Sequence, residues 1–466
     1  MQMLKNALDT DIENIYTNQK SFFSQQRTLP IKYRREILKK LLFAIRENEK
    51  RIHDALYNDL RKSGFESLTT ETILVEKEIK KMIKMLPVWS RPKRVKSSLL
   101  NFPSRDFIVP EPYGNVLIIT PWNYPFQLAM TPLVGAVAAG NTVVLKPSES
   151  SENTSLIVSE IINSVFDSSH VSVVQGDASV ASTLLKKRWD YIFYTGSTAV
   201  GKIVAKAAAE NLTPTTLELG GKSPCIIDET VPIKKTAKRI VWSKYINCGQ
   251  TCIAPDYLVV QKSIKSILVN NLINEIKSAF GKNPINSPDY GRIIHKKHFN
   301  KLKLSLNNQK ILYGGIQDEK QLYFGPTLVD EPPNASILMQ EEIFGPILPI
   351  ISFDSENEMH QILKGKEKPL AFYIFSNKKK FIDNIFKRYS FGGGVANDAI
   401  VHFANDNLPF GGIGNSGMGE YHGKYSFKIF SHYKPIVKRS FLFDLPQRYA
   451  PYPKSLSFLK FLINRL

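Results

Sequence analysis

The chain has 466 residues, of which 43% are hydrophobic, so it can bury a large core and is long enough for two or three domains. Its 62 Lys and Arg against 42 Asp and Glu give a net charge of +20, but these residues are scattered without interleaved aromatics, which disfavours a nucleic-acid partner. No apolar run reaches the roughly 18 residues of a membrane-spanning helix.

The first predicted elements are helices. From residue 6 to 86 apolar residues recur at three- and four-residue spacings, as in amphipathic helices. After a basic, polar segment, strands and helices alternate. Strands are expected at 115–120, 141–146, 172–176 and 191–195, and helices at 127–140, from about 153, and at 180–187. The strands are continuous apolar runs, which predicts a doubly wound, dinucleotide-type domain with a parallel sheet covered on both faces.

A second series begins near Ser223 and predicts another α/β domain. Strands are expected at 225–229, 257–261, 327–330, 348–353 and 371–376, with a long helix ending near 247 and another at 266–280. Beyond Phe391 the sequence is rich in glycine and indicates loops and a returning tail.

Two glycine motifs suggest nucleotide binding and fail its requirements. In YTGSTAVGKI, Gly196, Gly201 and Lys202 have the spacing of a triphosphate-binding loop, but Ile203 stands where Ser or Thr would hold magnesium. We interpret the segment as a strand, a glycine turn and the amino end of a helix, which favours a phosphate or pyrophosphate. The GxGxxG at 412–417 follows no buried strand and predicts a mobile or tightly packed loop.

Three polar residues lie among neighbours that suit catalysis. Glu218 in LELGG and Glu342 in EEIFGP sit beside glycine and apolar residues, which would raise the proton affinity of a carboxylate, although a solvated or paired surface acid is commoner. Asn123 in TPWNYPF suits a turn, or its amide could donate to a developing oxyanion.

The chain has three cysteines, and two of them lie in NCGQTCIAP. The small cysteine number and an amino terminus without an apolar signal region predict a reducing, cytoplasmic setting. This disfavours a disulfide, and no nearby His completes a zinc site, so Cys248 and Cys252 are either packed side chains or reactive thiols. Cys225 is predicted to be core. The HKKH at 295–298 has no acidic partner and predicts a solvated helical face, so we expect no metal.

Seven motifs, in this order, resemble the aldehyde dehydrogenase superfamily. They are PWNYPF (121–126), LKPSE (145–149), TGSTAVG (195–201), LELGGKSP (217–224), GQTCIAPDY (249–257), EEIFGP (341–346) and PFGGIGNSGMG (409–419). They extend over almost the whole chain, and PDYGRII and GEYHGKYSF are similar to the class 3, fatty-aldehyde branch.

The resemblance implies an α/β fold with three parts. These are a Rossmann-type NAD(P)-binding domain at 1–95 and 113–221, an α/β catalytic domain at 222–400, and a bridging or oligomerisation arm with a C-terminal tail at 96–112 and 401–466. It also implies a homodimer.

The resemblance further implies that Cys252 is the nucleophile. Its thiolate, with a pKa lowered below about 8.5, would form a thiohemiacetal, pass a hydride to NAD(P)+ and leave a thioester that water hydrolyses. Asn123 and the Cys252 backbone amide would stabilise the oxyanion, and Glu218 would activate water, with Glu342 as the alternative base.

The cofactor would be NAD or NADP. Lys146 and Glu149 match positions that contact the adenosine ribose, Ser197 lies near the pyrophosphate, and Glu342 holds the nicotinamide ribose in much of the superfamily. Glu149 would repel a 2′-phosphate and Lys146 would attract one, so the choice stays open. The implied cofactor residues are Trp122, Lys146, Glu149, Gly196, Ser197, Gly201, Glu342 and Phe344.

The predicted function is NAD(P)+-dependent oxidation of medium- or long-chain aliphatic, or aromatic, aldehydes to carboxylic acids. One alternative is a CoA-acylating relative, in which a thiol takes the acyl group. The other is a non-catalytic binding or structural use of the fold, which the joint presence of Cys252, Asn123, Glu218 and Glu342 disfavours.

Two features carry further hypotheses. Cys248 is predicted to be a small packed side chain that, under oxidation, could trap Cys252 as a disulfide. The C-terminal KSLSFLKFLINRL predicts a basic amphipathic helix that covers the substrate funnel, packs on its own dimer or touches an anionic bilayer as a peripheral contact. Its polar side holds Lys454, Ser457, Lys460 and Asn464, and its apolar side holds Phe458, Leu459, Leu462, Ile463 and Leu466.

Overall fold

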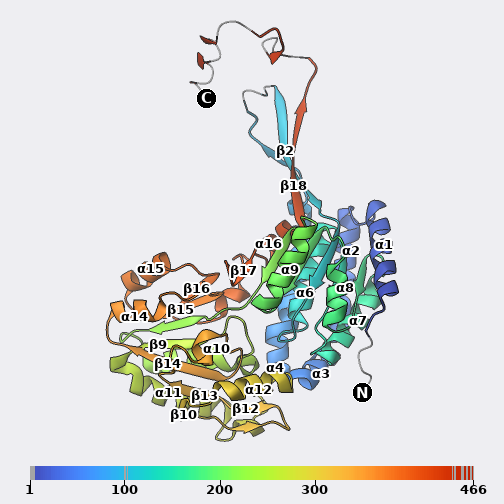
Figure 1. Ribbon diagram of the computed structural model, residues 1–466. Coiled ribbons are helices and arrows are strands. Elements are labelled where there is room, and N and C mark those ends of the chain that lie inside the picture. The colour runs from blue at the N-terminus through green and yellow to red at the C-terminus, as the bar shows by residue number, and fades with distance from the viewer. Residues whose placement is uncertain are drawn as a thin grey trace.

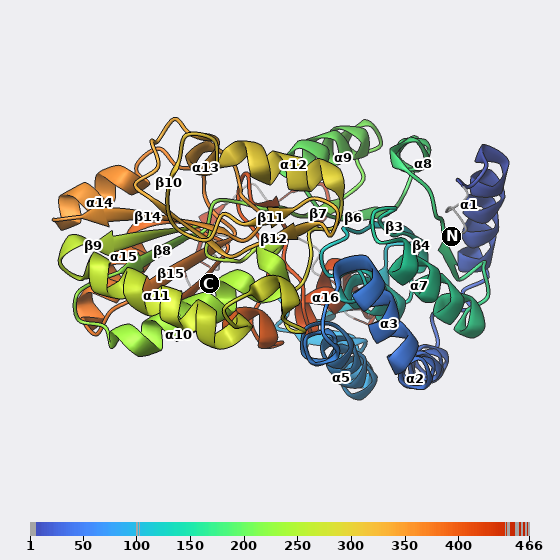
Figure 2. The ribbon, with the colours of Figure 1, turned by 90° about the horizontal axis from the view of Figure 1, so that it is seen from below.

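The computed structural model describes residues 6–98, 101, 103–442, 444, 448–452, 456–457, 460–461 and 464. Its α-helices are α1 (Asp9–Ser24), α2 (Ile31–Glu47), α3 (Glu49–Leu60), α4 (Gly64–Ser67), α5 (Ile73–Trp89), α6 (Gln127–Ala139), α7 (Glu152–Val165), α8 (Ala178–Leu185), α9 (Thr198–Glu210), α10 (Ile233–Tyr245), α11 (Lys265–Phe280), α12 (Lys296–Ser305), α13 (Ile337–Gln340), α14 (Glu356–Leu363), α15 (Lys379–Arg388) and α16 (Lys424–Ile429). They pack around two separate sheets, which form two lobes side by side (Figures 1 and 2).

The first lobe is built on a six-stranded sheet in the order β17-β7-β6-β3-β4-β5. Its strands are β3 (Asn115–Ile119), β4 (Thr142–Lys146), β5 (Val171–Val173), β6 (Tyr191–Thr195), β7 (Thr215–Glu218) and β17 (Gly417–Met418). All pairs are parallel except β17 with β7. The strand order reverses between β3 and β6, and open α/β sheets bind ligands outside the carboxyl ends of strands at such a switch point.

This sheet is covered on both faces, which explains its uninterrupted apolar strands. Val116 and Ile118 of β3 pack in one core with α2, α5, α6 and α7, whereas Leu117 and Ile119 pack in another with α1, α8 and α9. Successive side chains of a strand point to opposite faces, so both must be apolar here. The predicted doubly wound fold is confirmed.

The second lobe contains a seven-stranded sheet in the order β10-β13-β14-β9-β8-β15-β16. Its strands are β8 (Pro224–Ile227), β9 (Tyr257–Gln261), β10 (Lys310–Tyr313), β13 (Thr327–Asp330), β14 (Ile347–Phe353), β15 (Ala371–Phe375) and β16 (Gly393–Ala396). β10 is antiparallel to β13 and the other pairs are parallel. A short pair, β11 (Gln317–Asp318) and β12 (Tyr323–Phe324), lies apart from it.

The expectation of loops and a returning tail beyond Phe391 is wrong for β16, and it did not include α16 or the strand β18 (Ser431–Arg439). The glycines of β16 disfavour a strand locally, but pairing with β15 satisfies the backbone, and only the tertiary structure supplies that partner. Of the two alternatives predicted for the 412–417 motif, the structure shows the tightly packed one, because the Leu219 amide donates to the Ser416 carbonyl at 3.1 Å beside the β17–β7 pair.

A three-stranded arm projects from the first lobe (Figure 1). It pairs β1 (Lys93–Val95), β2 (Ser104–Pro112) and β18 (Ser431–Arg439) in the order β1-β2-β18, all antiparallel. No strands were expected in this region, because most of its side chains are only partly buried or exposed and its sequence lacks the long apolar runs of the buried strands.

Across the described ranges, no helix is both long and apolar enough to cross a membrane. Most of the predicted C-terminal helix, including Lys454 and all of its apolar side, lies outside the described residues, so that hypothesis stays a prediction.

Candidate active site

A cavity of about 630 Å³ opens where the two lobes meet. The segments after β3 and β6 contribute one wall, and loops of the second lobe contribute the other. Eight predicted site residues line it, namely Trp122, Asn123, Gly196, Ser197, Glu218, Cys252, Glu342 and Phe344. Lys146, Glu149 and Gly201 lie outside its wall.

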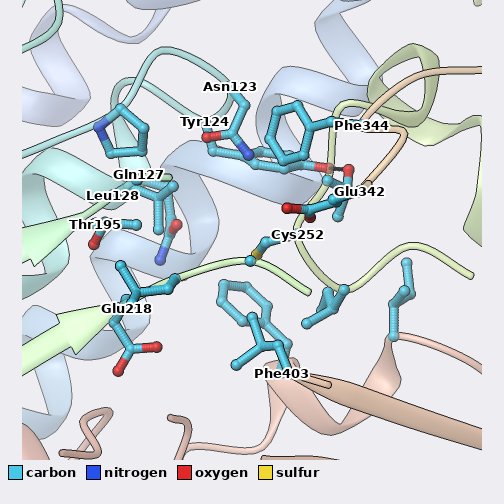
Figure 3. A pocket seen from close by; sticks show the side chains of 18 of the residues that line it. Asn123, Tyr124, Gln127, Leu128, Thr195, Glu218, Cys252, Glu342, Phe344 and Phe403 are labelled. Atoms are coloured by element: carbon cyan, nitrogen blue, oxygen red, sulfur yellow. Dashed lines mark hydrogen bonds between the residues drawn. The ribbon is translucent and has the colours of Figure 1, made fainter. Parts of the chain in front are cut away.

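Cys252 lies near the middle of the labelled side chains in Figure 3. Its loop follows α10 through a 3-10 turn, Ile246–Gly249, in which Asn247 and Cys248 adopt left-handed backbone angles, with φ of 50° and 55°. Gly249 is also left-handed, and a Cβ there would collide with the Gly345 backbone. The nucleophile loop is therefore packed tightly against the EEIFGP loop.

The thiol of Cys252 does not have the lowered pKa that nucleophilic cysteines often show. Burial raises its pKa, and the carboxylates of Glu342 and Glu218 push it further in the same direction. The thiol is therefore protonated at neutral pH in this arrangement, and a neighbouring group must accept its proton before it attacks.

Glu218 is the last residue of β7 and is only 3% exposed. Neither carboxylate oxygen has a hydrogen-bond partner in the described part of the chain, and burial raises the pKa well above its usual range. It is a desolvated acid, not the solvated surface acid that is commoner at such positions. The residue lines the cavity, but its carboxylate points away from Cys252 in Figure 3, so it must rotate to reach a group bound at the thiol.

Glu342 lies on a different side of Cys252 from Glu218 (Figure 3). Burial raises its pKa to about 8, nearby Asp256 adds to the rise, and a hydrogen bond from the Gly221 amide opposes it. The loop is fixed by Asp256, which accepts the Ile343 amide at 3.0 Å and contacts Lys222. Sequence reasoning missed Lys222 and Asp256, although they belong to the LELGGKSP and GQTCIAPDY motifs.

Asn123 is 2% exposed, in the loop after β3. Its side-chain Nδ2 donates to the Gln250 backbone carbonyl at 3.1 Å. The backbone carbonyl of Asn123 accepts a hydrogen bond from the Asn247 side-chain amide at 2.7 Å. The second Nδ2 hydrogen stays available, and Figure 3 shows the amide nitrogen on the side of Asn123 that faces Cys252. The amide is thus oriented to donate near the thiol.

The other end of the cavity fits a dinucleotide. β6 leads through Gly196 to Ser197, which caps α9 by accepting the Val200 amide at 3.4 Å. Thr195 leaves a buried hydroxyl without a partner among the described residues. A helix amino terminus beside an unused hydroxyl suits a pyrophosphate, and the predicted strand, turn and helix are confirmed.

The remaining expected cofactor residues lie close to this end. Lys146 ends β4, is buried and donates to Glu149 at 2.8 Å, while Glu149 is exposed. Gly201 lies inside α9, where a Cβ would collide with Leu219, so it lets the helix pack on the sheet end.

Trp122 and Phe344 pack edge to face, 5.3 Å apart. His295 and His298 join them, and the ring of His298 shares a 2.7 Å hydrogen bond with the Phe344 carbonyl. The predicted helix is confirmed as α12, but the histidines are half-buried and not solvated, because their rings pack on the indole. Burial lowers the pKa of His298 to about 4.

All three cysteines are free thiols. Cys225 is buried in β8, as predicted. Cys248 is also fully buried, with its sulfur 3.8 Å from the Phe324 carbonyl, and burial raises its pKa to about 12. Its predicted packing is confirmed, while its proposed exchange with Cys252 stays a prediction.

The matching family model is the aldehyde dehydrogenase family, over residues 2–436. The chain is 45% identical to a 4,4′-diaponeurosporen-aldehyde dehydrogenase of Staphylococcus aureus, over 96% of this chain and 98% of that protein. It is also 45% identical to mouse aldehyde dehydrogenase family 3 member A2, over 95% of this chain and 92% of that one.

Solved structures agree. A substrate-bound Staphylococcus aureus AldH matches with a TM-score of 0.94 and 44% identity, over 97% of this chain and 99% of that one. A glyceraldehyde-3-phosphate dehydrogenase of Methanocaldococcus jannaschii, complexed with NADP, matches with a TM-score of 0.83 and 25% identity, over 93% and 95%. The chain therefore belongs to the aldehyde dehydrogenase family, in its class 3 branch, and is an oxidoreductase that oxidises aldehydes to carboxylic acids with NAD(P)+.

Proposed function

We propose that Cys252 is the nucleophile of this reaction. The observation that carries the proposal is its position in one cavity with an oriented amide, Asn123, and two buried carboxylates, Glu218 and Glu342. A thiol whose pKa burial has raised needs an acceptor for its proton, and a carboxylate whose pKa is near 8 can serve at neutral pH.

In the first half of the reaction, Glu342 accepts the thiol proton as the Cys252 sulfur bonds to the aldehyde carbon. The carbonyl oxygen becomes an oxyanion held by Asn123 Nδ2 and the Cys252 backbone amide. When bound, NAD(P)+ would supply the acceptor for the hydride on this carbon, and Cys252 would then carry the acyl group as a thioester.

In the second half, the ionised form of Glu218 takes a proton from water, and the water oxygen bonds to the thioester carbon. The carbon–sulfur bond then breaks, the acid leaves, and the sulfur regains a proton. We assign the water to Glu218 because this residue lines the cavity and no group among the described residues holds either of its carboxylate oxygens, so the side chain can turn toward the thioester, whereas Glu342 already accepts a backbone amide.

We also propose that the dinucleotide cofactor binds to a second group of residues. These are Trp122, Gly196, Ser197, Gly201, Lys146, Glu149, Glu342 and Phe344. Ser197 and the α9 amino terminus would hold the pyrophosphate, and the Lys146–Glu149 pair would hold the adenosine ribose of NAD or NADP. Phe344 and Trp122 would flank the nicotinamide end.

The proposed substrates are medium- or long-chain aliphatic aldehydes, and aromatic ones. The far end of the cavity supports this, because its wall is largely apolar. This wall includes Leu128, Trp242, Ile246, Ile400 and Phe403. An apolar chain gains about 0.8 kcal/mol per buried CH₂ in such a site.

We also propose a cytoplasmic homodimer that is joined through the arm. The arm supports this because β18 is a long edge strand with exposed Tyr433 and Val437, and edge strands favour pairing with another chain. The basic C-terminal segment would touch an anionic bilayer as a peripheral contact.

The test follows reduced cofactor by absorbance, with hexanal, a long-chain aldehyde and benzaldehyde, each with NAD+ or NADP+. We expect turnover by the wild type and none by Cys252→Ala. Equal turnover in both would remove Cys252 from the mechanism. Turnover that requires CoA and yields acyl-CoA would favour the acylating alternative.

A further inference from the structure

A group of charged residues lies just behind the cavity without lining it. Lys62, Glu66 and Glu71 come from the amino-terminal helical segment, where α4 passes into a π-helical turn, Leu68–Thr72. The side chains of Lys62 and Glu71 are 1% and 0% exposed. Buried charges cost stability, and π-helical turns such as the one that contains Glu71 occur frequently at functional sites.

Glu71 and Lys62 tie this segment to the loop of Asn123. Glu71 accepts the amides of Phe126 and Gln127 at 3.0 and 2.9 Å, and Lys62 Nζ lies 2.5 Å from its other oxygen. Lys62 also donates to the Asn123 carbonyl at 3.4 Å. The segment therefore holds the loop that presents the proposed oxyanion donor.

Glu66 ties the same segment to the loop of Cys252. Its Oε1 accepts the Asn247 amide at 2.8 Å, at the first of the two left-handed residues. The Asn247 side chain then donates to the carbonyls of Asn123, at 2.7 Å, and Gln250, at 3.1 Å. Gln250 is also the acceptor for Asn123 Nδ2, so one network fixes both halves of the oxyanion site.

We propose that Glu66 is a positioning residue that acts in its ionised form, by holding the strained Asn247–Cys248 turn so that Asn123 and the Cys252 loop keep their catalytic geometry. Left-handed backbone angles are unfavourable for non-glycine residues and persist only where the surroundings fix them. A carboxylate holds an amide through a hydrogen bond roughly twice as strong as a neutral acceptor does. The inference rests on the proposed roles of Asn123 and Cys252.

The proposal gives Glu66 a specific pH dependence. Burial raises its pKa to about 7, with Lys62 and the Asn247 amide opposing the rise and Glu71 and Asp289 adding to it. Cys248 and Tyr124 are the other titratable groups that interact with it. As the pH falls below 7, Glu66 increasingly takes up a proton and becomes neutral, whereas the side chain of a Glu66→Gln variant is neutral at every pH.

The test compares wild type with Glu66→Gln by the rate of the first-turnover burst of reduced cofactor. At pH 8.5 we expect a loss of about tenfold, smaller than the roughly hundredfold cost of a 1 Å misplacement. At pH 6 the two rates should be nearly equal. Taking the ratio of the two burst rates at each pH cancels the effect of groups that titrate in the same way in both proteins. KM and the melting temperature should be unchanged, since Glu66 touches neither substrate nor cofactor in this proposal.

Glu47→Gln, on the exposed end of α2, is the matched control for charge and should match wild type throughout. Equal rates for wild type and Glu66→Gln at pH 8.5, or a ratio independent of pH, would overturn the proposal, as would a loss that accompanies a lower melting temperature. Cys252→Ala run in parallel separates the two ideas, because turnover by that variant would contradict the catalytic assignment and not the role of Glu66.

Discussion

The Glu342 carboxylate packs so closely on Gly220 that a Cβ at position 220 would overlap its oxygens. Gly220 therefore sets where this acid lies beside Cys252. The overlapping atoms are the far end of a flexible side chain, so Glu342 can move away without a backbone shift.

Gly220→Ala should consequently displace Glu342 and leave the fold intact. We expect the burst rate to fall by up to about a hundredfold, the cost of a 1 Å misplacement of a catalytic group, while the melting temperature stays close to that of wild type. Pre-steady-state burst kinetics and thermal unfolding would measure these two quantities. A large drop in melting temperature would show that the backbone had moved instead.

Asn123→Ala should slow the reaction without weakening cofactor binding. Removal of one oxyanion donor costs about 10²–10³ in kcat, and Asn123 contributes its amide to the oxyanion in the proposed mechanism. Burst kinetics and the Kd of NAD(P)+ would be measured together. A kcat within twofold of wild type would remove Asn123 from the oxyanion site.

Glu342→Gln should be the more stable protein at high pH. The pKa of Glu342 is raised to about 8 in the folded protein, against 4.5 for an ordinary glutamate. Its contribution to the free energy of unfolding is therefore fully present below pH 4.5 and is lost as the pH rises through 8. We expect the melting temperature of the variant to exceed that of wild type more at pH 9 than at pH 6. An equal difference at both values would contradict the raised pKa.

Glu149→Gln should shift preference toward NADP+. The change removes a carboxylate that would repel a 2′-phosphate and frees Lys146, now 2.8 Å from that carboxylate, to attract one. We expect kcat/KM for NADP+ to rise several-fold relative to NAD+. Glu152→Gln, at the start of α7, provides a nearby charge control. If the ratio of kcat/KM for NADP+ to that for NAD+ does not change, the 2′ position of the adenosine ribose does not lie beside Glu149.

The Cys248 hypothesis has its own test. If Cys248 traps an oxidised Cys252, activity lost to peroxide should return with a thiol reductant in wild type and not in Cys248→Ser. If wild type and Cys248→Ser recover their activity equally, or lose it irreversibly to the same extent, Cys248 is a packed side chain only.

The sequence by itself determined the fold class and most of the strands and helices of both sheets. Strands such as 115–119 and 142–146 are buried on both faces, so they appear in the sequence as continuous apolar runs that can be recognised without knowledge of their partners. It also placed Cys252, Asn123, Glu218 and Glu342 in one site through ordered motifs, and the structure brings these four residues to one cavity.

Only the tertiary structure decided the electrostatics of that site and the elements that depend on distant partners. The raised pKa of Cys252 follows from burial and from two acids that lie far from it in the chain. The arm and β16 exist because remote strands complete their hydrogen bonds, and Glu66 reaches Asn247 across 181 positions. Desolvation and long-range pairing are properties of the assembled chain, which local pattern does not encode.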